Sequence, residues 1–374
     1  MRLVFISSTV VGGSGRSQRE LAAQLVRRGH QVRFVVDDHR RGRLIRWLSP
    51  RFAALARRAA GTPASATVGR LASLPGRRSR PESIGGLQHR CTAVPENALE
   101  SELNRFAPDV VVANSLDLGS WRRTVEICTR RRIPTVLYIR EQVSLMHMSE
   151  GAVPGAIVAN SASLAAAIRA QGFACELIPS VVDFAVTRTE SSRQVALAIN
   201  PTESRGIDMV WSIAARMPHI RFVVQESWTL PHTQVRDIEA HVGRLPNVEF
   251  RRAIEPGPAL YSDARVLLVP HRVDNRPRVI AEAFANGIPA IVSDLPGLVE
   301  AAGEVGIRVA ADDVDGWCDA VQQVWSDAAE YERLVDAALA GSKQLASSVG
   351  SVVDTFEAVL HRLVRPDDAT FRTA

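Results

Sequence analysis

The strongest constraint on the fold is a regular alternation of short apolar runs with segments long enough to form helices. The runs are rich in Val, Ile and Leu, and each has the length of a buried strand. Alternation of this kind favours βαβ units and a parallel sheet with helices on both faces. In the first half of the chain, the expected strands are residues 2–8, 31–36, 109–113, 135–139, 156–158 and 175–178.

The alternation begins again after residue 182, with expected strands at 194–199, 221–224, 266–270, 290–292 and 307–310. We therefore predict two doubly wound domains, residues 1–182 and 183–349, because 374 residues of which 46% are hydrophobic can bury two cores. Apolar residues recur at helical spacing in 350–365. That helix either packs back on the first domain or belongs to the core of the second, and 366–374 read as a polar tail.

Charge and composition exclude several classes of protein. The formal charge is +5, carried almost entirely by arginine, and Lys343 is the single lysine. A phosphate-binding P-loop needs Gly-Lys-Ser/Thr, which this sequence lacks. The basic balance is not accompanied by a zinc-finger spacing, an aromatic RNA-binding motif or a basic heptad helix. We therefore expect neither a P-loop ATPase nor a nucleic-acid partner.

Other patterns bear on compartment and cofactor. No apolar run approaches the roughly 20 residues that span a bilayer, and the first residues enter a strand without a cleavable apolar segment. Cys91, Cys128, Cys175 and Cys318 are scattered, which fits reduced thiols in a cytoplasm rather than metal ligands. A basic amphipathic segment at 39–60 could lie on an anionic membrane, although a solvated helix face or acceptor-side loop is favoured.

The first loop carries the glycines Gly12-Gly13-Ser14-Gly15 before a helix expected at 16–28, which Gly29-His30 stops. Backbone N–H groups at such a helix start can bind a phosphate. The same loop half-matches a dinucleotide site, since Asp37 follows the second strand. The third glycine of that fingerprint would fall at Gln18, so the match is incomplete.

The most informative stretch is 270–300, where two carboxylates bracket a turn and a short helix. Asp274 lies in the loop and Glu282 in the helix, with seven residues between them. Both can face the carboxyl ends of the strands, where open parallel sheets bind ligands, and carboxylates accept hydrogen bonds from paired hydroxyls. On spacing alone, the alternative is that Glu282 complements the helix dipole and Asp274 decorates a turn.

This stretch resembles family 4 retaining glycosyltransferases of the GT-B fold, the glycosyl transferases group 1. Their pattern is an acid, seven residues and Glu-Ala, then Gly-x-Pro, an apolar strand and Asp-x-x-Gly-x-x-Glu. The corresponding positions here are Asp274, Glu282-Ala283, Gly287-Ile288-Pro289 and the segment from Asp294 to Glu300. Gly12-Gly13 and Gly29-His30 also resemble the first loop and first helix end of that family. The resemblance implies two Rossmann-like domains facing a cleft.

The resemblance also implies roles for particular residues in binding a nucleoside-diphosphate sugar. The family holds the diphosphate with an Arg and a Lys in the loop before the first helix of the second domain; here these positions are Asn200 and Arg205. Arg205 keeps the charge and offers a fork for phosphate, although a solvated loop arginine is the alternative. Further donor-binding candidates are Gly12, Gly13, Gly206, Arg278, Val279 and Glu282, with Glu282 accepting from the ribose diol.

Three departures from the family pattern concern the sugar and the acceptor. Asp274 replaces the usual Glu and is the candidate to hold a sugar hydroxyl, while Pro277 removes one backbone N–H from the following segment. After the strand at 135–139, many members carry a histidine, and this chain has Arg140-Glu141. That pair either binds an acceptor group or forms a simple ion pair. His147 and His271 lie near strand ends and are further candidates.

The function implied by the resemblance is retaining transfer of a hexose from a nucleoside-diphosphate sugar to an acceptor hydroxyl, with no metal and no cofactor beyond that co-substrate. The acceptor can be a small molecule, a lipid-linked sugar or a glycan. Two alternatives remain. A NAD(P)-dependent oxidoreductase or sugar-nucleotide epimerase depends on Gly13-Ser14-Gly15 with Asp37. A catalytically silent GT-B binding protein is motivated by the departures at Asn200, Pro277 and Arg140.

Overall fold

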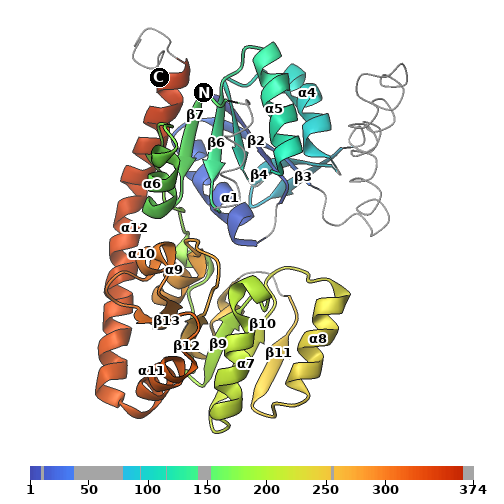
Figure 1. Ribbon diagram of the computed structural model, residues 1–374. Coiled ribbons are helices and arrows are strands. Elements are labelled where there is room, and N and C mark those ends of the chain that lie inside the picture. Colours follow the sequence, from blue (N-terminus) through green and yellow to red (C-terminus); the bar gives the residue numbers. More distant parts are fainter. Residues whose placement is uncertain are drawn as a thin grey trace. The chain divides into compact units, whose positions relative to one another are not determined.

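The protein forms two compact units in a computed structural model (Figure 1), which describes residues 1–9, 12–37, 79–92, 94–114, 116–141, 153–253 and 257–364. The first unit comprises Met1–Asn160, Leu164–Val181 and Val352–Ala374, and the second comprises Ser161–Ser163 and Val182–Ser351. Two sequence-based expectations, the basic segment 39–60 and the tail 366–374, lie outside the described residues.

The first unit is built on one twisted sheet with the strand order β3-β4-β2-β1-β5-β6-β7-β8. Its strands pair in parallel, except that β3 is antiparallel to β4. The chain passes from β1 to β2 on one side and later returns to β5 on the other, so the topological switch point lies between β1 and β5. The strands are β1 (Arg2–Ser7), β2 (Gln31–Asp37), β3 (Arg80–Ile84), β4 (Leu87–Thr92), β5 (Val110–Asn114), β6 (Thr135–Ile139), β7 (Ala156–Ala159) and β8 (Glu176–Leu177).

Helices cover this sheet because its central strands β1, β5 and β6 are apolar on both faces. One face packs against α4, α5 and α6, where Trp121 is fully buried among strand residues such as Val4 and Val111. The end of α12 also belongs to this unit, with Phe356 stacked on Tyr138 at 6.4 Å between ring centroids. The helices are α1 (Gly12–Arg27), α4 (Pro95–Phe106), α5 (Leu118–Arg130) and α6 (Ala162–Ala170), with α12 running over Ala328–Val364.

The second unit has a wholly parallel sheet with the order β11-β10-β9-β12-β13-β14, so its switch point lies between β9 and β12. The strands are β9 (Val195–Ile199), β10 (Arg221–Gln225), β11 (Val248–Arg251), β12 (Ala264–Val269), β13 (Ala290–Ser293) and β14 (Ile307–Val309). The helices are α7 (Ile207–Arg216), α8 (His232–Val242), α9 (Arg278–Phe284), α10 (Pro296–Ala302) and α11 (Val314–Ser326), with 3-10 turns η2 (Phe184–Val186), η3 (Glu203–Arg205) and η4 (Pro258–Leu260).

Alternate residues along the strands of the second sheet pack into two separate hydrophobic cores, one on each face. Ala196, Phe222 and Leu268 point into the core formed with α7, α11 and the start of α12. Leu197 and Leu267 point into the core formed with α9 and α10. The period-two alternation therefore buries both faces of the central strands β9, β12 and β13, as expected for a parallel sheet.

The predicted α/β class with parallel sheets is confirmed, and several local expectations are corrected. Helix α1 begins at Gly12 rather than at residue 16, because the left-handed φ of +71° at Gly12 turns the chain directly into the helix. No strand was expected between residues 36 and 109, where the structure contains the hairpin β3–β4; Gly85 and Gly86 both have positive φ and form its tight turn. Helices α8 and α10 were not expected from the sequence.

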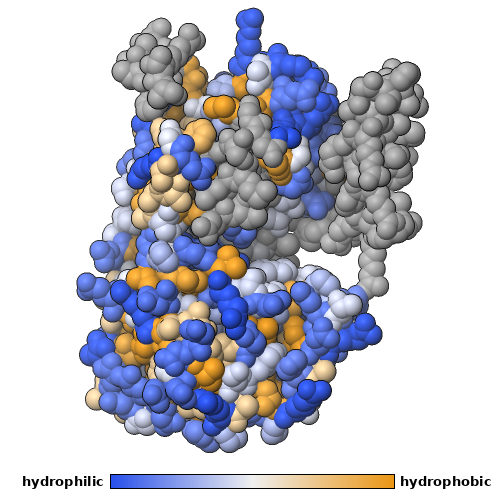
Figure 2. All heavy atoms as spheres, viewed as in Figure 1, coloured by the Kyte–Doolittle hydropathy of each residue, from blue (hydrophilic) through white to orange (hydrophobic). Residues whose placement is uncertain are grey.

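The visible face in Figure 2 mixes polar and apolar side chains. Within the described residues, the large exposed apolar side chains are scattered valines such as Val26, Val153 and Val273. No described helix combines the length and the apolar character needed to cross a membrane. Burial raises the pKa of the Cys128 thiol to about 12 and that of Cys175 to about 11, so both remain protonated at neutral pH.

Candidate functional site

The switch point of the second sheet brings together the loops that follow β9 and β12. Open parallel sheets bind ligands outside the carboxyl ends of their strands at such a point. The loop after β9 runs from Asn200 through η3 to Gly206, where α7 begins, and the loop after β12 starts at Pro270. The N-terminus of α7 carries the partial positive charge of the helix dipole and N–H groups without intrahelical partners.

Gly206 is the point of closest approach between these two loops. Its φ is +69°, in the left-handed region, and a Cβ atom added there would lie 1.7 Å from the carbonyl oxygen of Pro270. Only glycine fits both restrictions. The backbone at the start of α7 is therefore held directly against the end of β12, and the fold positions these amides without help from a side chain.

Arg205 precedes Gly206 and contacts His271, with 3.2 Å between Nη1 of the arginine and Nδ1 of the imidazole. Burial, reinforced by the nearby charge of Arg205, lowers the pKa of His271 to about 3. The imidazole is therefore neutral at physiological pH. Its Nδ1 lies within reach of both the guanidinium and, at 3.0 Å, Oδ1 of Asn275, and the tautomer sets whether it accepts from the first or donates to the second. A buried neutral imidazole thus lies beside the cation at the start of α7.

Asn200 ends β9 in the left-handed region, with φ of +63°. Its Oδ1 accepts from the backbone N of Ser227 at 3.1 Å and from the Oγ of Ser227 at 2.5 Å. The side chain therefore ties the end of β9 to the loop after β10. Asn200 occupies the expected place at the carboxyl edge, and its carbonyl oxygen is used to hold the neighbouring loop.

Asp274 lies in the loop after β12 and binds the start of α10. Its Oδ1 accepts from the backbone N of Gly297 at 2.7 Å, and its Oδ2 from the Oγ of Ser163 at 3.2 Å. A Cβ at position 297 would lie 2.9 Å from that carboxylate oxygen and 2.7 Å from the carbonyl oxygen of Asn275. The acid and the glycine of the sequence motif are thus direct partners, with the carboxylate complementing the helix dipole of α10.

Glu282 is enclosed within the second unit, with its side chain only 1% exposed. Its Oε1 accepts from the Nε of Arg278 at 2.5 Å and its Oε2 from the hydroxyl of Tyr261 at 2.7 Å. Arg278 is itself buried one turn earlier on α9, and Val279 beside it is half-buried. The predicted ribose acceptor therefore forms a buried ion pair that fixes α9, with Tyr261 as a partner that spacing did not indicate.

The switch point of the first unit carries a chain of hydrogen bonds that starts on α1. Asn114, at the end of β5, donates to the Oγ of Ser14 at 2.7 Å and accepts from the Nε of Arg140 at 3.0 Å. Arg140 also donates to the Oγ of Ser180 at 2.8 Å, and its guanidinium lies 4.1 Å from the ring centroid of Tyr138. The arginine that replaces the family histidine is thus a buried, positioned cation.

The other predicted residues of this unit differ in exposure. Glu141 is exposed, whereas its neighbour Arg140 is buried, so the two side chains have different environments. Gly12 and Gly13 form the first turn of α1, at the same edge as Ser14. His147 lies outside the described residues.

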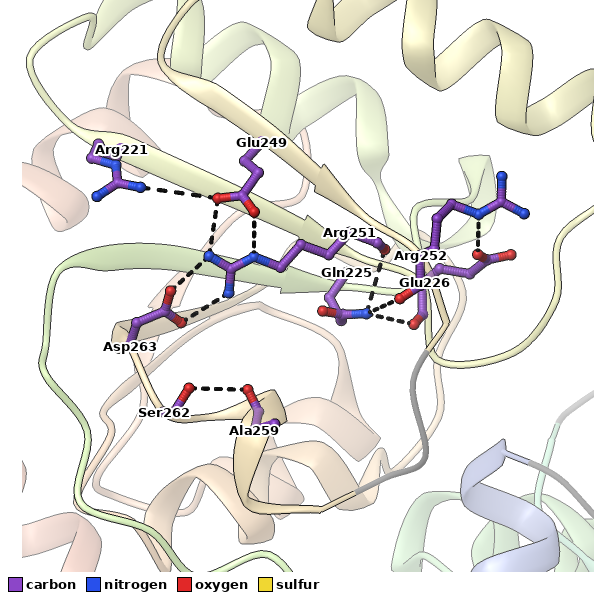
Figure 3. Close-up of polar contacts among 9 residues, drawn as sticks. All are labelled: Arg221, Gln225, Glu226, Glu249, Arg251, Arg252, Ala259, Ser262 and Asp263. Carbon is purple, nitrogen blue, oxygen red and sulfur yellow. Dashed lines mark hydrogen bonds and ion pairs between the residues drawn. The ribbon is translucent and has the colours of Figure 1, made fainter.

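A second polar cluster follows β10 and β11, and sequence reasoning missed it (Figure 3). Glu226 is buried and accepts from the backbone N of Leu230 at 2.5 Å, from that of Ala253 at 2.9 Å and from the Nε of Arg252 at 2.9 Å. Gln225 donates to the carbonyl oxygens of Glu226 and Arg252 at 2.8 and 2.9 Å. An acid directly after a strand was the available signal, as it was for Asp37.

Within the part of the chain that the structure describes, no three His, Cys, Asp or Glu side chains gather as metal ligands. Residues 213–327 match the model of a family described as glycosyl transferases group 1. No curated protein sequence matches the chain significantly.

Solved structures resemble the chain over nearly its whole length. HepE from Anabaena, in complex with UDP and glucose, has a TM-score of 0.70 at 13% identity, covering 96% of this chain and 100% of that one. Sucrose-phosphate synthase from Thermosynechococcus elongatus has a TM-score of 0.71 at 14% identity, covering 97% and 99%. The catalytic domain of Starch Synthase IV from Arabidopsis thaliana, bound to ADP and acarbose, has a TM-score of 0.64 at 12% identity, covering 97% and 99%.

At this level of identity the structural likeness establishes the fold, two Rossmann-like domains of the GT-B class, and the predicted fold is confirmed. The resemblance to glycosyl transferases group 1 is also confirmed, through the match over 213–327. That match includes Asp274, Arg278, Val279 and Glu282, whereas Asn200 and Arg205 precede it. The retaining subclass and the roles of individual residues stay predictions.

Proposed function

We propose that this chain, a GT-B protein whose residues 213–327 match glycosyl transferases group 1, transfers a hexose from a nucleoside-diphosphate sugar to an acceptor hydroxyl. Transfer would retain the anomeric configuration and need no metal. The acceptor is a small molecule, a lipid-linked sugar or a glycan. The observation that carries the proposal is that the family match includes β12 and α9, the half of the second unit's switch point that carries Asp274, Arg278 and Glu282.

The carboxyl edge of the second unit's sheet, at the start of α7, is best suited to bind the diphosphate of the donor. Arg205, which contacts neutral His271, and the N-terminal amides of α7 after Gly206 supply positive charge and hydrogen-bond donors at one place. Preorganised donors of this kind stabilise the negative charge that builds up on a departing diphosphate. Asn200 belongs to the same edge, where it holds the loop after β10 in position.

Helix α9 forms the second part of the proposed donor site. We assign Glu282 a positioning role, because its two oxygens hold Arg278 and Tyr261 and so fix the start of α9 at Arg278 and Val279. Asp274 fixes α10 in the same manner through Gly297. Its second oxygen accepts from the Ser163 hydroxyl at 3.2 Å, and we assign to this oxygen the contact with the sugar hydroxyl.

The acceptor side of the reaction is assigned to the first unit. The buried guanidinium of Arg140, with Asn114 and Ser14, and the exposed carboxylate of Glu141 lie after neighbouring strands at its switch point. The backbone amides of Gly12 and Gly13 at the start of α1 can donate to a phosphate oxygen. In a retaining front-face transfer, the leaving phosphate oxygen takes the proton of the acceptor hydroxyl, so the protein contributes positioning and charge stabilisation rather than a general base.

A thermal-shift series tests the donor assignment. UDP, GDP, dTDP, ADP, their sugar conjugates and NAD(P) are added in the presence of EDTA. A ligand at about 100 times its Kd stabilises the folded state by roughly 2.7 kcal/mol. We expect one nucleoside diphosphate to raise Tm in the native protein, and Arg205→Met to abolish that shift. Arg236→Met, which removes an exposed arginine on α8, serves as the matched control and should keep it.

Each alternative predicts a different outcome. A shift with NAD(P) alone would contradict the proposal and favour the oxidoreductase. Binding of a nucleotide sugar without release of nucleoside diphosphate, in the presence of a panel of acceptors and of water, would favour the silent binding protein. The anomeric configuration of the glycoside product, compared with that of the donor sugar, decides between retention and inversion.

A further inference from the structure

Arg252 is a cation placed at the ligand-binding edge on a buried anchor. It follows β11, its side chain is 53% exposed, and its Nε donates to Oε2 of Glu226, whose side chain is only 1% exposed. Figure 3 shows this contact beside the backbone of Arg251. Among the residues that the structure describes, the guanidinium of Arg252 donates a hydrogen bond to Glu226 alone. The Nε is thus committed to the anchor, while the edge formed by the two terminal nitrogens remains for a ligand.

Glu226 is occupied entirely by protein donors. Besides Arg252, it accepts from the backbone N of Leu230 and of Ala253, at 2.5 and 2.9 Å. In a dinucleotide-binding sheet, an acid after the second strand binds the ribose. Here the acid at that place instead joins the loop after β10 to the end of β11. Its function is therefore to hold the guanidinium of Arg252 in one orientation.

The backbone of Arg252 is restrained as well. Gln225 donates from Nε2 to the carbonyl oxygen of Arg252 at 2.9 Å and to that of Arg251 at 3.3 Å. Arg251 in turn is held by the carboxylates of Glu249 and Asp263. A side chain restrained at both its backbone and its Nε loses little rotamer entropy on binding, which is the condition for a specific polar contact.

The position of Arg252 matches one end of a bound nucleotide. Strands β9, β10 and β11 are consecutive neighbours in the sheet. Adjacent strands are about 4.8 Å apart, so the end of β11 lies roughly 10 Å along the carboxyl edge from the end of β9 and the loop before α7. That span is comparable to the length of a nucleoside. A nucleotide whose phosphate lies at α7 can therefore bring its base to Arg252.

We propose that Arg252 selects the base of the donor and that it reads guanine through the adjacent acceptors O6 and N7. This inference rests on the proposed function, in which a nucleoside diphosphate binds at the start of α7. The two terminal nitrogens of a guanidinium match O6 and N7 in a bidentate contact. Adenine presents an amino group in place of O6, and a pyrimidine offers no such pair of adjacent acceptors, so both bind Arg252 less well.

Isothermal titration with GDP, IDP, ADP and UDP tests this assignment. IDP keeps O6 and N7 but lacks the 2-amino group of guanine. We expect GDP and IDP to bind about 10-fold or more tightly than ADP and UDP, the size of a bidentate base contact. Arg252→Met should remove this preference while leaving UDP affinity within about 2-fold. Arg252→Lys, which keeps the charge but loses the fork, should lose most of the preference too.

The controls distinguish failure of this inference from failure of the proposed function. Arg236→Met, an exposed arginine on α8, should retain the full preference for GDP. Tighter binding of UDP than GDP, or a loss in Arg252→Met that is equal for all four nucleotides, overturns base selection while the donor site stands. Absence of binding by every nucleoside diphosphate overturns both.

Discussion

Replacement of Glu282 by alanine should destabilise the second unit before it affects any ligand. The change leaves the buried Arg278 guanidinium without the carboxylate that it contacts at 2.5 Å, and the Tyr261 hydroxyl without its acceptor at 2.7 Å. Removing one partner of a buried ion pair costs about 3–5 kcal/mol. In a unit of this size, each kcal/mol lowers Tm by about 2–4 °C, so we expect Tm to fall by about 10 °C.

Urea denaturation followed by tryptophan fluorescence measures this loss, since Trp317 is fully buried in the same unit. Tyr261→Phe serves as the matched variant. It removes only the hydroxyl donor and leaves the ion pair, so about 1 kcal/mol should be lost. Equal denaturation midpoints for Glu282→Ala and the native protein would refute the reasoning, because only an exposed or weakly bound carboxylate can be removed without a loss of stability.

Loss of donor binding in the Glu282→Ala variant has two causes, a missing contact and a loosened α9. Glu282→Gln keeps an acceptor toward Tyr261 and the shape of the side chain, so it is the better probe. Retained donor affinity in the folded glutamine variant would support a positioning role rather than direct contact with ribose.

Two further predictions concern stability. Gly206→Ala places a Cβ 1.7 Å from the Pro270 oxygen at a positive φ, so the free energy of unfolding should fall by about 2 kcal/mol or more; Gly350→Ala, with no atom within 4 Å of its Cβ, should be neutral or stabilising. Acid should destabilise the protein through His271 and His89, whose folded pKa values of about 3 and about 4 lie below the ordinary value, because the unfolded chain then binds more protons below pH 6.5. Between pH 7 and 5, each should contribute a loss of about 2 kcal/mol, and a denaturation midpoint in His89→Gln with the native pH dependence would contradict this.

Elements set by local pattern were predictable from the sequence. The strand β6 has the bounds that were expected, because a run of buried apolar residues defines it. The hairpin β3–β4 was not expected, since its strands carry charged residues and its Gly85-Gly86 turn lies in a region rich in glycine and proline. Helix α10 was missed because its seven residues are too few for a clear period.

For the candidate site, the spacing of residues in the sequence predicted some of the members but not their environments. The spacing of Asp274, Glu282 and Gly297 indicated which residues matter, and the structure shows that the first and last are partners across 23 residues of chain. Spacing cannot report burial, so it did not reveal that Glu282 is enclosed by Tyr261. The contact between Glu226 and Arg252 depends on the order of the strands in the sheet, which a single sequence does not display.

The division of α12 between the two units has a consequence for biosynthesis. The first unit is completed by residues from Val352 onward, where Phe356 stacks on Tyr138 and Glu357 accepts from Arg28. A ribosome adds about 5–20 residues per second, so roughly 10–30 s separate the synthesis of Val181 from that of this helix. For that time the nascent first unit exposes the apolar surface that α12 later covers. A released chain that ends before Val352 should therefore bind chaperones that a released chain extending through residue 374 does not bind.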